Sequence, residues 1–298
     1  MRDTLNISFT VGIPTYLGGA NLVRTVKTIR ASEGVGPFRF LVCVDGRPLT
    51  ADVESELQSL GVEVLYSEQR GGQIARIKQM VTTATTDVIV LTQDDVLFTP
   101  RALAEIISMF KRTQSLTMVG ANIQPIPATT FFESVVEVGV RMTHAIGERW
   151  RNGDNYLMAS GRCMAFRTAA IRSWDLPTTV INSDAYQYFV NKFFGGTFAY
   201  AKNAVVYNKS PLKVKEHLRQ SRRFFVSKSE LNHYFKKDLS TEYAPPKNLL
   251  IRSLGRELLY HPISTASYLT IELVSKLGQK KRATEMTNMW EPDVSTKR

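Results

Sequence analysis

The sequence is poor in the residues that build zinc sites and disulfides. It has only two cysteines, Cys43 and Cys163, each inside an apolar run typical of a strand. We therefore expect two buried free thiols rather than a disulfide or a metal site, as in a reducing cytosol. The four histidines are His144, His217, His233 and His261. They lie too far apart for an HExxH or Cys/His zinc motif, which excludes a zinc centre of those types.

Long hydrophobic runs are also missing. No stretch approaches the ~18 consecutive apolar residues of a transmembrane helix. The best candidate, Pro262 to Leu277, contains Glu272 and several hydroxyl residues. The first ten residues lack the charged start and apolar stretch of a secretory signal. These absences predict a cytoplasmic protein that does not cross a membrane by itself.

Positive charge, in contrast, is abundant. The 298 residues carry a formal net charge of +11. Lys and Arg crowd two C-terminal stretches, Lys209 to Lys237 and Lys276 to Arg282, whereas the first 65 residues are nearly balanced. A basic surface attracts nucleic acid, anionic lipid or phosphorylated substrates, so we expect such a partner at the C-terminal part.

Apolar, β-branched runs alternate with helical patterns over roughly the first 120 residues. Strands are predicted at 7–13, 39–44, 62–65 and 88–91, and helices at 21–30, 51–60 with Thr50 as a cap, and 72–84. This alternation predicts a parallel sheet with right-handed crossovers. Ligands of such sheets bind at the carboxyl ends of the strands, so the loops after residues 13, 44 and 91 are the expected site.

The alternation lapses after about residue 120. The segments 161–171, 182–196 and 198–208, the last with two strands, FAYA and AVVYN, read as a mixed extension of the same sheet. A basic, aromatic helix is expected from Lys213 to Lys237, and one or two helices over 247–277. We expect a catalytic domain at 1–225, with halves 1–120 and 121–225, and a basic helical extension at 226–298.

Two neighbouring carboxylates, Asp94 and Asp95, follow the apolar strand VIVLT after Gln93. Desolvating such a pair is unfavourable without a cation or a network of donors. Magnesium or manganese would supply that cation and would bind substrate phosphates as well. The alternative is a cap for the helix that opens near Pro100, a role that Thr99 also fits.

Asp45 follows the strand RFLVCV, and its carboxylate is expected at the same edge of the sheet. Asp45-Gly46 taken alone is also an ordinary turn. Gly71-Gly72 leads into Arg76 and Lys78, two cations near a helix start that suit phosphate or ribose contact. A solvated helix face explains those cations equally well.

The order of motifs from Asn182 onward is the most specific signal. Asn182-Ser183-Asp184 precedes aromatic helix positions, then come Gly195-Gly196, two apolar runs, and Gln220-Ser221-Arg222-Arg223-Phe224. This order resembles the family-2 inverting glycosyltransferases, especially the cellulose and hyaluronan synthase branch, whose pattern runs from an acidic pair through Gly to Gln-x-x-Arg-Trp. The resemblance extends from Ile7 to about Phe225. A helix cap at Asp184 and a surface segment at 220–224 remain the alternatives for each motif singly.

The resemblance implies a GT-A fold: an α/β, Rossmann-like, mixed and mostly parallel sheet flanked by helices. It implies a nucleotide-sugar site and an acceptor site. The implied nucleotide-sugar residues are Pro14, Thr15, Tyr16, Asp45, Arg76, Lys78, Asp94, Gln220 and Arg223. The implied acceptor residues are Gly161, Met164 and Phe224, with Asp95 as the ligand of Mg²⁺ or Mn²⁺ and Asp184 as the catalytic base.

Three departures from the family pattern stand out. Gln93 replaces the first carboxylate of the Asp-x-Asp metal motif, which leaves Asp95 as the direct ligand. Ser183 stands where a glutamate often precedes the base. Phe224 replaces the tryptophan, which keeps a stacking surface and loses the indole donor.

The implied reaction is transfer of a sugar from a nucleoside diphosphate, UDP by preference and GDP next, to an acceptor hydroxyl with inversion. Surface polysaccharide, glycolipid or other glycan assembly is the expected context. Two other functions fit parts of the sequence: a nucleic-acid-binding protein, which explains the charge but not the acidic loops, and a sugar-phosphate nucleotidyltransferase, whose Gly- and Lys-rich signature is absent from GIPTYLGG.

The basic C-terminal part suggests a peripheral site at the cytoplasmic face of a membrane, with a lipid-linked acceptor or a membrane protein partner. Ala266, Leu269, Leu273 and Leu277 form a helical stripe, followed by a cluster of cations. Packing of this stripe against the catalytic domain or another subunit is the alternative.

Overall fold

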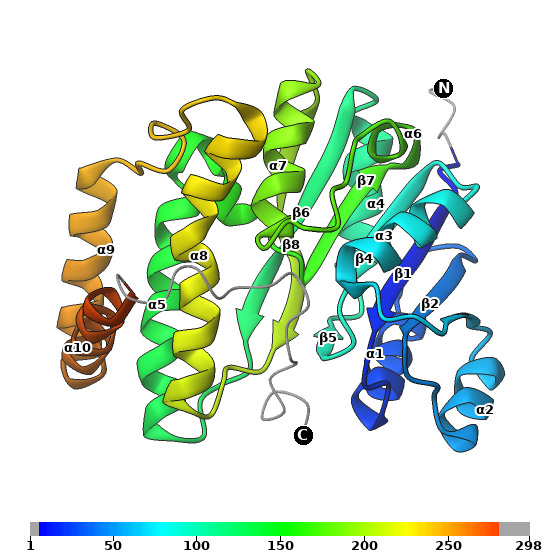
Figure 1. The fold of residues 1–298 in the computed structure, drawn as a ribbon, viewed down its shortest axis with the longest axis horizontal. Helices are drawn as coiled ribbons and strands as arrows, with labels where there is room; N and C mark the ends of the chain where they lie inside the picture. Colours follow the sequence, from blue (N-terminus) through cyan, green and yellow to red (C-terminus); the bar gives the residue numbers. More distant parts are fainter. Residues whose placement is uncertain (1–5, 280–298) are drawn as a thin grey trace. The chain divides into compact units, whose positions relative to one another are not determined.

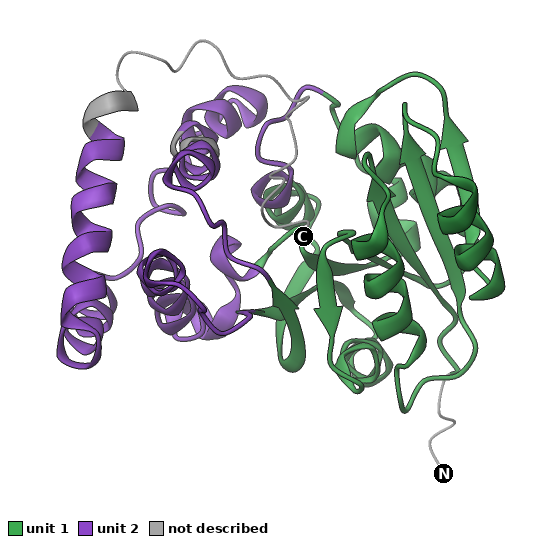
Figure 2. Ribbon diagram, turned by 90° about the horizontal axis from the view of Figure 1, so that it is seen from below, with its two compact units in different colours: residues 1–124, 159–178, 187–208 green, residues 125–158, 179–186, 209–298 purple. Residues whose placement is uncertain are grey.

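The computed structural model describes residues 6–279, apart from the side chains of Arg222, Arg223 and Phe225 and of residues 277–279. The described chain forms two compact units, each built from several segments (Figure 2). Unit 1 comprises residues 1–124, 159–178 and 187–208, and unit 2 comprises residues 125–158, 179–186 and 209–298.

Unit 1 is built on an eight-stranded mixed sheet in the order β3-β2-β1-β4-β7-β6-β8-β5 (Figure 1). The strands are β1 (Phe9–Thr15), β2 (Arg39–Asp45), β3 (Glu63–Ser67), β4 (Val88–Thr92), β5 (Val96–Phe98), β6 (Leu116–Pro125), β7 (Cys163–Arg167) and β8 (Thr197–Asn208). β3, β2, β1 and β4 are mutually parallel, whereas β7 is antiparallel to both β4 and β6. The predicted parallel sheet and its mixed extension are confirmed.

One prediction about the extension is wrong. The two strands expected within 198–208 are a single strand, β8, which pairs with β5 at its carboxyl end. Lys202 and Asn203, which separate the two apolar runs, stay in strand conformation because the residues on both sides of them belong to the same sheet. A polar pair in the middle of a long strand is therefore no proof of a turn.

The helices of unit 1 place apolar faces on the sheet. They are α1 (Ala20–Arg30), α2 (Ala51–Ser59), α3 (Gly72–Thr83), α4 (Ala102–Arg112) and the short α6 (Thr168–Arg172). In α4 the side chains of Leu103, Ile106 and Phe110 are buried, at the spacing of one helical face. Thr50 does precede α2, but its side chain makes no capping hydrogen bond. The helix expected from Pro100 begins at Ala102 with Arg101 at the N-cap.

Both cysteines are free and buried in this sheet, as predicted. Burial raises the pKa of the Cys43 thiol to about 12, although the Arg76 guanidinium opposes the shift. Burial also raises the pKa of Cys163. Burial therefore disfavours the reactive thiolate form of both residues.

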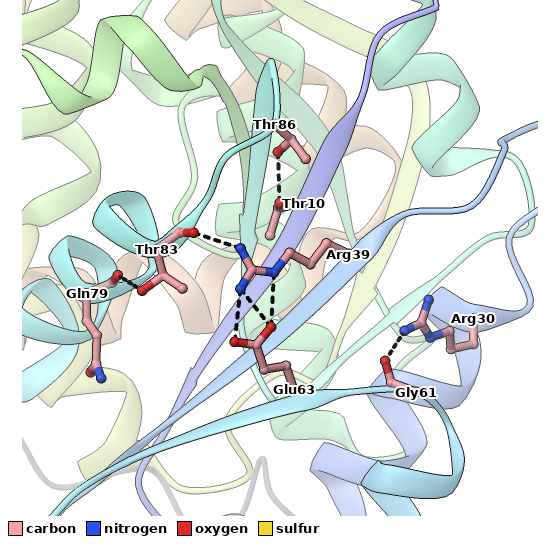
Figure 3. A network of polar contacts seen from close by, with 8 residues as sticks. All are labelled: Thr10, Arg30, Arg39, Gly61, Glu63, Gln79, Thr83 and Thr86. Carbon is pink, nitrogen blue, oxygen red and sulfur yellow. Dashed lines mark hydrogen bonds and ion pairs between the residues drawn. The ribbon is translucent and has the colours of Figure 1, made fainter.

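A polar network holds the amino-terminal edge of the parallel strands (Figure 3). Arg39, the first residue of β2, forms a bidentate ion pair with Glu63, the first residue of β3, and donates to the Thr83 carbonyl at the end of α3. On the next pair of strands, the hydroxyls of Thr10 and Thr86 are 2.8 Å apart. These contacts fix the strand register at this edge and leave the carboxyl ends to the loops described below.

Unit 2 is helical. It contains α5 (Phe131–Gly147), the 3₁₀ turns η1 (Trp150–Gly153) and η2 (Tyr156–Met158), α8 (Val214–Phe235), α9 (Lys247–Tyr260) and α10 (Pro262–Gln279). Thr130 and Glu133 start α5 with a capping box. α7 (Ser183–Phe193) contributes its first turn to unit 2 and the rest to unit 1.

The units do not divide the chain at residue 225, where a domain boundary was expected. α8 runs without interruption through that position, and residues 125–158 fold with the C-terminal helices rather than with the sheet. None of the helices within residues 6–279 is long and apolar enough to span a bilayer.

Candidate functional site

Polar residues gather where the parallel strands β1, β2 and β4 of unit 1 end. β1 ends at Thr15 and β2 at Asp45, while Asp94 lies two residues beyond the end of β4. Because β2, β1 and β4 are adjacent and parallel, these positions share one edge of the sheet. The structure thus brings together the three loops that the sequence singled out.

Asp45 organises the entrance to α3. Its two carboxylate oxygens accept hydrogen bonds from the backbone N–H groups of Gly71 at 2.8 Å and Gly72 at 2.9 Å. Its Oδ1 also lies 3.2 Å from Nε of Arg76. Asp45 is almost fully buried, so the two backbone donors and the positive charge of Arg76 are needed to offset the loss of hydration.

Asp94 is held by the end of β1. The Thr15 hydroxyl donates to its Oδ2 at 2.5 Å, and the same hydroxyl accepts a hydrogen bond from the Gly18 N–H at 3.1 Å. Asp94 is buried, whereas its neighbour Asp95 is only partly buried. The alternative role as a helix cap is not observed, since α4 starts at Ala102 without a side-chain cap. Within this pair, Asp94 joins two loops and Asp95 presents the more accessible carboxylate.

A residue that the sequence argument missed, Arg70, joins two more of these loops. Its guanidinium lies over the Tyr16 ring, 4.0 Å from the ring centroid. Gly46 sits against the backbone of Arg70 at a φ of 81°, and a Cβ there would lie 3.0 to 3.2 Å from Arg70 atoms. The sequence signal that could have identified Arg70 is its position directly before Gly71-Gly72.

The two cations of α3 have different surroundings. Arg76 is largely buried, faces Asp45 and donates to the Gln79 side chain at 2.8 Å. Lys78 is exposed on another face of the helix. Pro14, which was also predicted to line the nucleotide-sugar site, lies in β1 and pairs with Cys43 of β2. Arg76 therefore supports the loop architecture, and Lys78 stays a prediction.

The donor set suits a magnesium or manganese ion that also binds phosphate. Within the described residues, no three His, Cys, Asp or Glu side chains gather closely enough to hold a metal alone. Asp95 offers hard carboxylate oxygens and is only partly buried. A divalent ion bound by one carboxylate would take its other ligands from phosphate oxygens and water, as magnesium commonly does.

In unit 2, the segment before α7 is tied to α8. The Glu230 carboxylate accepts hydrogen bonds from the backbone N–H groups of Ile181 at 2.7 Å and Asn182 at 3.2 Å. The Asn182 amide donates to the Ser227 hydroxyl at 2.9 Å. Burial raises the pKa of Glu230, and the two backbone donors oppose that shift. Glu230 and Ser227 were missed in the sequence, although Glu230 is one of only two acids in a basic stretch.

This anchoring places Asp184 in the first turn of α7. The cap is supplied by Asn182, whose Oδ1 accepts from the Ala185 N–H at 3.3 Å, so Asp184 does not take that role. The Ser183 hydroxyl donates to Asp184 Oδ1 at 3.2 Å. Asp184 is partly buried, and its charge lies near the positive end of the helix dipole.

The remaining predicted residues fall into two groups. On α8, Gln220 is partly buried and Phe224 is 64% exposed, while the side chain of Arg223 lies outside the described residues. In the sheet, Gly161 is buried before β7, and Met164 is buried within β7 opposite Leu91 and Gly120. An exposed phenylalanine can contact a ligand directly, whereas a buried Met164 can only shape a site from beneath.

Residues 7–226 match the model of the family described as "Glycosyltransferase like family 2". The chain belongs to this family. The match covers the whole sheet and all the loops described above. No curated protein matches the chain in sequence.

Solved structures show the same fold at low sequence identity. A mannosyltransferase from Pyrobaculum calidifontis, in complex with GDP-Man and Mn²⁺, is 14% identical with a TM-score of 0.59, over 94% of this chain and 84% of that one. S. aureus TarS in complex with UDP is 13% identical with a TM-score of 0.54, over 92% of both chains.

A third similar structure is glucosyl-3-phosphoglycerate synthase from Mycobacterium tuberculosis, with Mn²⁺, UDP and glucosyl-3-phosphoglycerate. It is 13% identical with a TM-score of 0.53, over 80% of this chain and 81% of that one. These likenesses confirm the GT-A type of fold that the sequence predicted.

Proposed function

We propose that this protein transfers a sugar from a nucleoside diphosphate to an acceptor hydroxyl with inversion at the anomeric carbon. UDP is the preferred donor nucleotide and GDP the second choice. The observation that carries the proposal is the convergence of the loops after β1, β2, β3 and β4, joined by Thr15–Asp94, Asp45–Gly71 and Arg70–Tyr16 contacts. Three similar structures that bind UDP, GDP-Man or Mn²⁺ support the ligand class.

On the donor side, the loop residues have distinct tasks. Tyr16 and Asp45 contact the nucleoside, with Pro14, Thr15, Arg76, Lys78 and Asp94 supporting that half of the site. Asp95 would hold Mg²⁺ or Mn²⁺, which neutralises the charge that develops on the departing diphosphate. Arg223 and Gln220 bind the same phosphates, since a guanidinium offers a rigid fork of donors.

On the acceptor side, Asp184 is the general base. The acceptor oxygen forms a bond to the anomeric carbon as the bond from that carbon to the diphosphate oxygen breaks, and Asp184 takes the acceptor proton. Phe224 packs against the acceptor, with Gly161 and Met164 shaping the wall. The acceptor is a glycan, a glycolipid or a lipid-linked sugar.

Calorimetry tests the donor site. We expect UDP to bind with manganese present, to bind less tightly with EDTA, and to bind Asp95→Ala at least about tenfold more weakly. Asp52→Ala, which removes an exposed carboxylate from α2, should bind UDP like the unaltered protein. Equal affinity with and without metal, or an unaffected Asp95→Ala, would remove Asp95 as the ligand.

Turnover tests the base. With saturating donor and acceptor, Asp184→Asn should lower kcat by about 10²- to 10⁴-fold and leave UDP affinity unchanged. Asp175→Asn, at an exposed position of unit 1, serves as the control. Near-normal sugar transfer by Asp184→Asn would refute this assignment.

A further inference from the structure

The last two helices of unit 2, α9 and α10, bury polar side chains and expose large apolar ones. In α9 the buried side chains are Ser253 and Glu257, each about 5% exposed, whereas Ile251 is 70% and Leu259 is 75% exposed. A helix of a globular protein ordinarily turns its apolar stripe to the core and its charged face to water. α9 instead buries a serine and a glutamate and exposes several large apolar side chains.

α10 repeats this pattern. Thr265 and Ser275 are buried, while Ile263, Leu273 and Val274 are exposed. We define the α9–α10 apolar surface as Leu250, Ile251, Leu258, Leu259, Tyr260, Ile263, Leu269, Leu273 and Val274. These nine residues outnumber the seven other large exposed hydrophobic residues identified in the described part of the chain, which are spread over its remaining elements. So dense a cluster marks an interaction surface.

Specific inward contacts fix the rotation of both helices on α5, beside which they lie (Figures 1 and 2). In α9, Glu257 binds Arg141 at 2.9 Å. In α10, the Ser264 hydroxyl lies 3.1 Å from that of Ser134. Gly139 leaves room for the Tyr268 ring, which a Cβ at that position would approach to 2.8 Å. Rotating either helix to bury its apolar side would break these contacts. The contacts therefore stabilise the orientation in which the apolar side chains are exposed.

The charges around this surface have one sign. The exposed charged residues of α9 and α10 that the structure describes are Lys247, Arg252, Arg256 and Lys276. Both acidic residues of these helices point inward: Glu257 to Arg141 and Glu272 to His217, whose Nε2 is 3.5 Å away. Apolar side chains bordered only by cations match an anionic lipid surface, which offers acyl chains and negative headgroups together.

We propose that the α9–α10 apolar surface docks on an anionic lipid bilayer, with the helices lying in its interface rather than crossing it. A second copy of the chain is the less suitable occupant, because a symmetric contact would bring like cations together. Leu269 and Leu273 of the sequence stripe belong to this surface, Ala266 is also exposed, and the side chain of Leu277 lies outside the described residues. α9 adds the larger part of the surface. This inference concerns binding alone and stands apart from the proposed sugar transfer.

Vesicle flotation of the full chain tests the proposal. We expect flotation with vesicles that contain one third phosphatidylglycerol in phosphatidylcholine at about 0.05 M salt, and weaker binding to phosphatidylcholine alone or in high salt. Leu259→Ser with Ile263→Ser should weaken partition at least about tenfold. Tyr66→Ser with Phe194→Ser, which removes two exposed aromatic residues of unit 1, should float like the unaltered protein.

Arg252→Gln with Arg256→Gln should also weaken binding, but only to the anionic vesicles. Circular dichroism of each variant shows that the fold is kept. Failure to float, or flotation that the Leu259 and Ile263 changes leave intact, would overturn the proposal. Concentration-dependent dimers that these two changes abolish, without lipid binding, would assign the surface to a protein partner instead.

Discussion

Helices α4 and α9 are both amphipathic, yet they face opposite ways. α4 buries Leu103, Ile106 and Phe110 against the sheet and exposes Lys111 and Arg112 at its end. α9 buries Ser253 and Glu257 and exposes Ile251, Leu258 and Leu259. The periodicity of apolar residues therefore locates a stripe on a helix without saying what covers it. The hydrophobic effect favours removal of such a stripe from water. The sheet buries the stripe of α4 and, in our proposal, a lipid surface buries that of α9.

The largest difference should appear in stability. Phe110→Ala removes a fully buried ring that also lies under the Arg167 guanidinium, 5.2 Å from the ring centroid. We expect it to lower the free energy of unfolding by about 3–5 kcal/mol. Leu259→Ala on α9 should change it by less than about 0.5 kcal/mol, because the side chain is in water in both states. Urea unfolding of the two variants measures both values.

The two outcomes would be informative separately. A large loss of stability in Leu259→Ala would mean that its side chain is packed in solution, and the inverted reading of α9 would fail. A small loss in Phe110→Ala would mean that α4 is loosely packed on the sheet. The comparison holds only if the two variants differ in the stated direction.

The polar contacts beneath α9 give the next largest effect. Arg141 lies between Glu257 and Glu137, and its removal would leave two largely buried carboxylates without their shared cation. Arg141→Gln should therefore destabilise unit 2 by about 2–4 kcal/mol. Glu257→Gln keeps the Arg141–Glu137 pair and should lose less, about 1–2 kcal/mol.

Thermal unfolding of the single variants and of the double variant checks this order. The double variant should lose less than the sum of the singles, since the residues share one network. If Glu257→Gln were as harmful as Arg141→Gln, the arginine would not be the shared partner that the structure shows.

The parallel half of the sheet was predictable because local pattern and tertiary role agree there. The runs that became β1, β2 and β4 are mostly apolar, as expected of strands covered on both faces. β8 was mispredicted because pairing with neighbouring strands overrides the weak strand propensity of Lys202 and Asn203. The directions of α9 and α10 could not be predicted, because they depend on Arg141 and on Gly139 respectively, each more than a hundred residues away in sequence.

In the candidate site, the acidic residues at the strand ends could be predicted from the sequence, but the residues that contact the site loops from elsewhere could not. Asp45 and Asp94 could be placed because a carboxylate at the end of an apolar strand needs a donor or a cation. Arg70 and Glu230 could not, because nothing in their local sequence says that one will lie on Tyr16 and the other under the backbone of Asn182. Family order, rather than local chemistry, singled out Asp184.

Substitutions of two glycines, one in a loop of unit 1 and one in α9, should have smaller and opposite effects on stability. Gly46→Ala places a methyl group 3.0 to 3.2 Å from Arg70 atoms at a φ of 81°, which should destabilise unit 1 by about 1–2 kcal/mol and weaken UDP binding. Gly255→Ala lies in α9 with nothing within 4 Å of the new Cβ, and should add about 0.5–1 kcal/mol of stability. Unfolding and UDP titration of both variants test this opposition; a stabilising Gly46→Ala would contradict the tight loop seen here.

The smallest effect concerns pH at the start of β4. The Ser8 hydroxyl and backbone N–H donate to Asp87 at 2.7 and 2.8 Å and hold the pKa of this carboxyl below its usual value. A lowered pKa in the folded state means that the stabilisation is present above the unfolded-state pKa of about 3.9 and is lost as the pH falls through the folded-state pKa.

Asp87→Asn should therefore lose at most about 1 kcal/mol at neutral pH, since the group is exposed and screened, and the difference from the unaltered protein should shrink toward strong acid. Unfolding measured from neutral to acidic pH tests the sign. Asp52→Asn controls for the loss of one negative charge from the surface of the same unit. A difference that grew in acid would mean that the Ser8 contacts do not favour the charged carboxylate, and that the strand start is held by its backbone pairing alone.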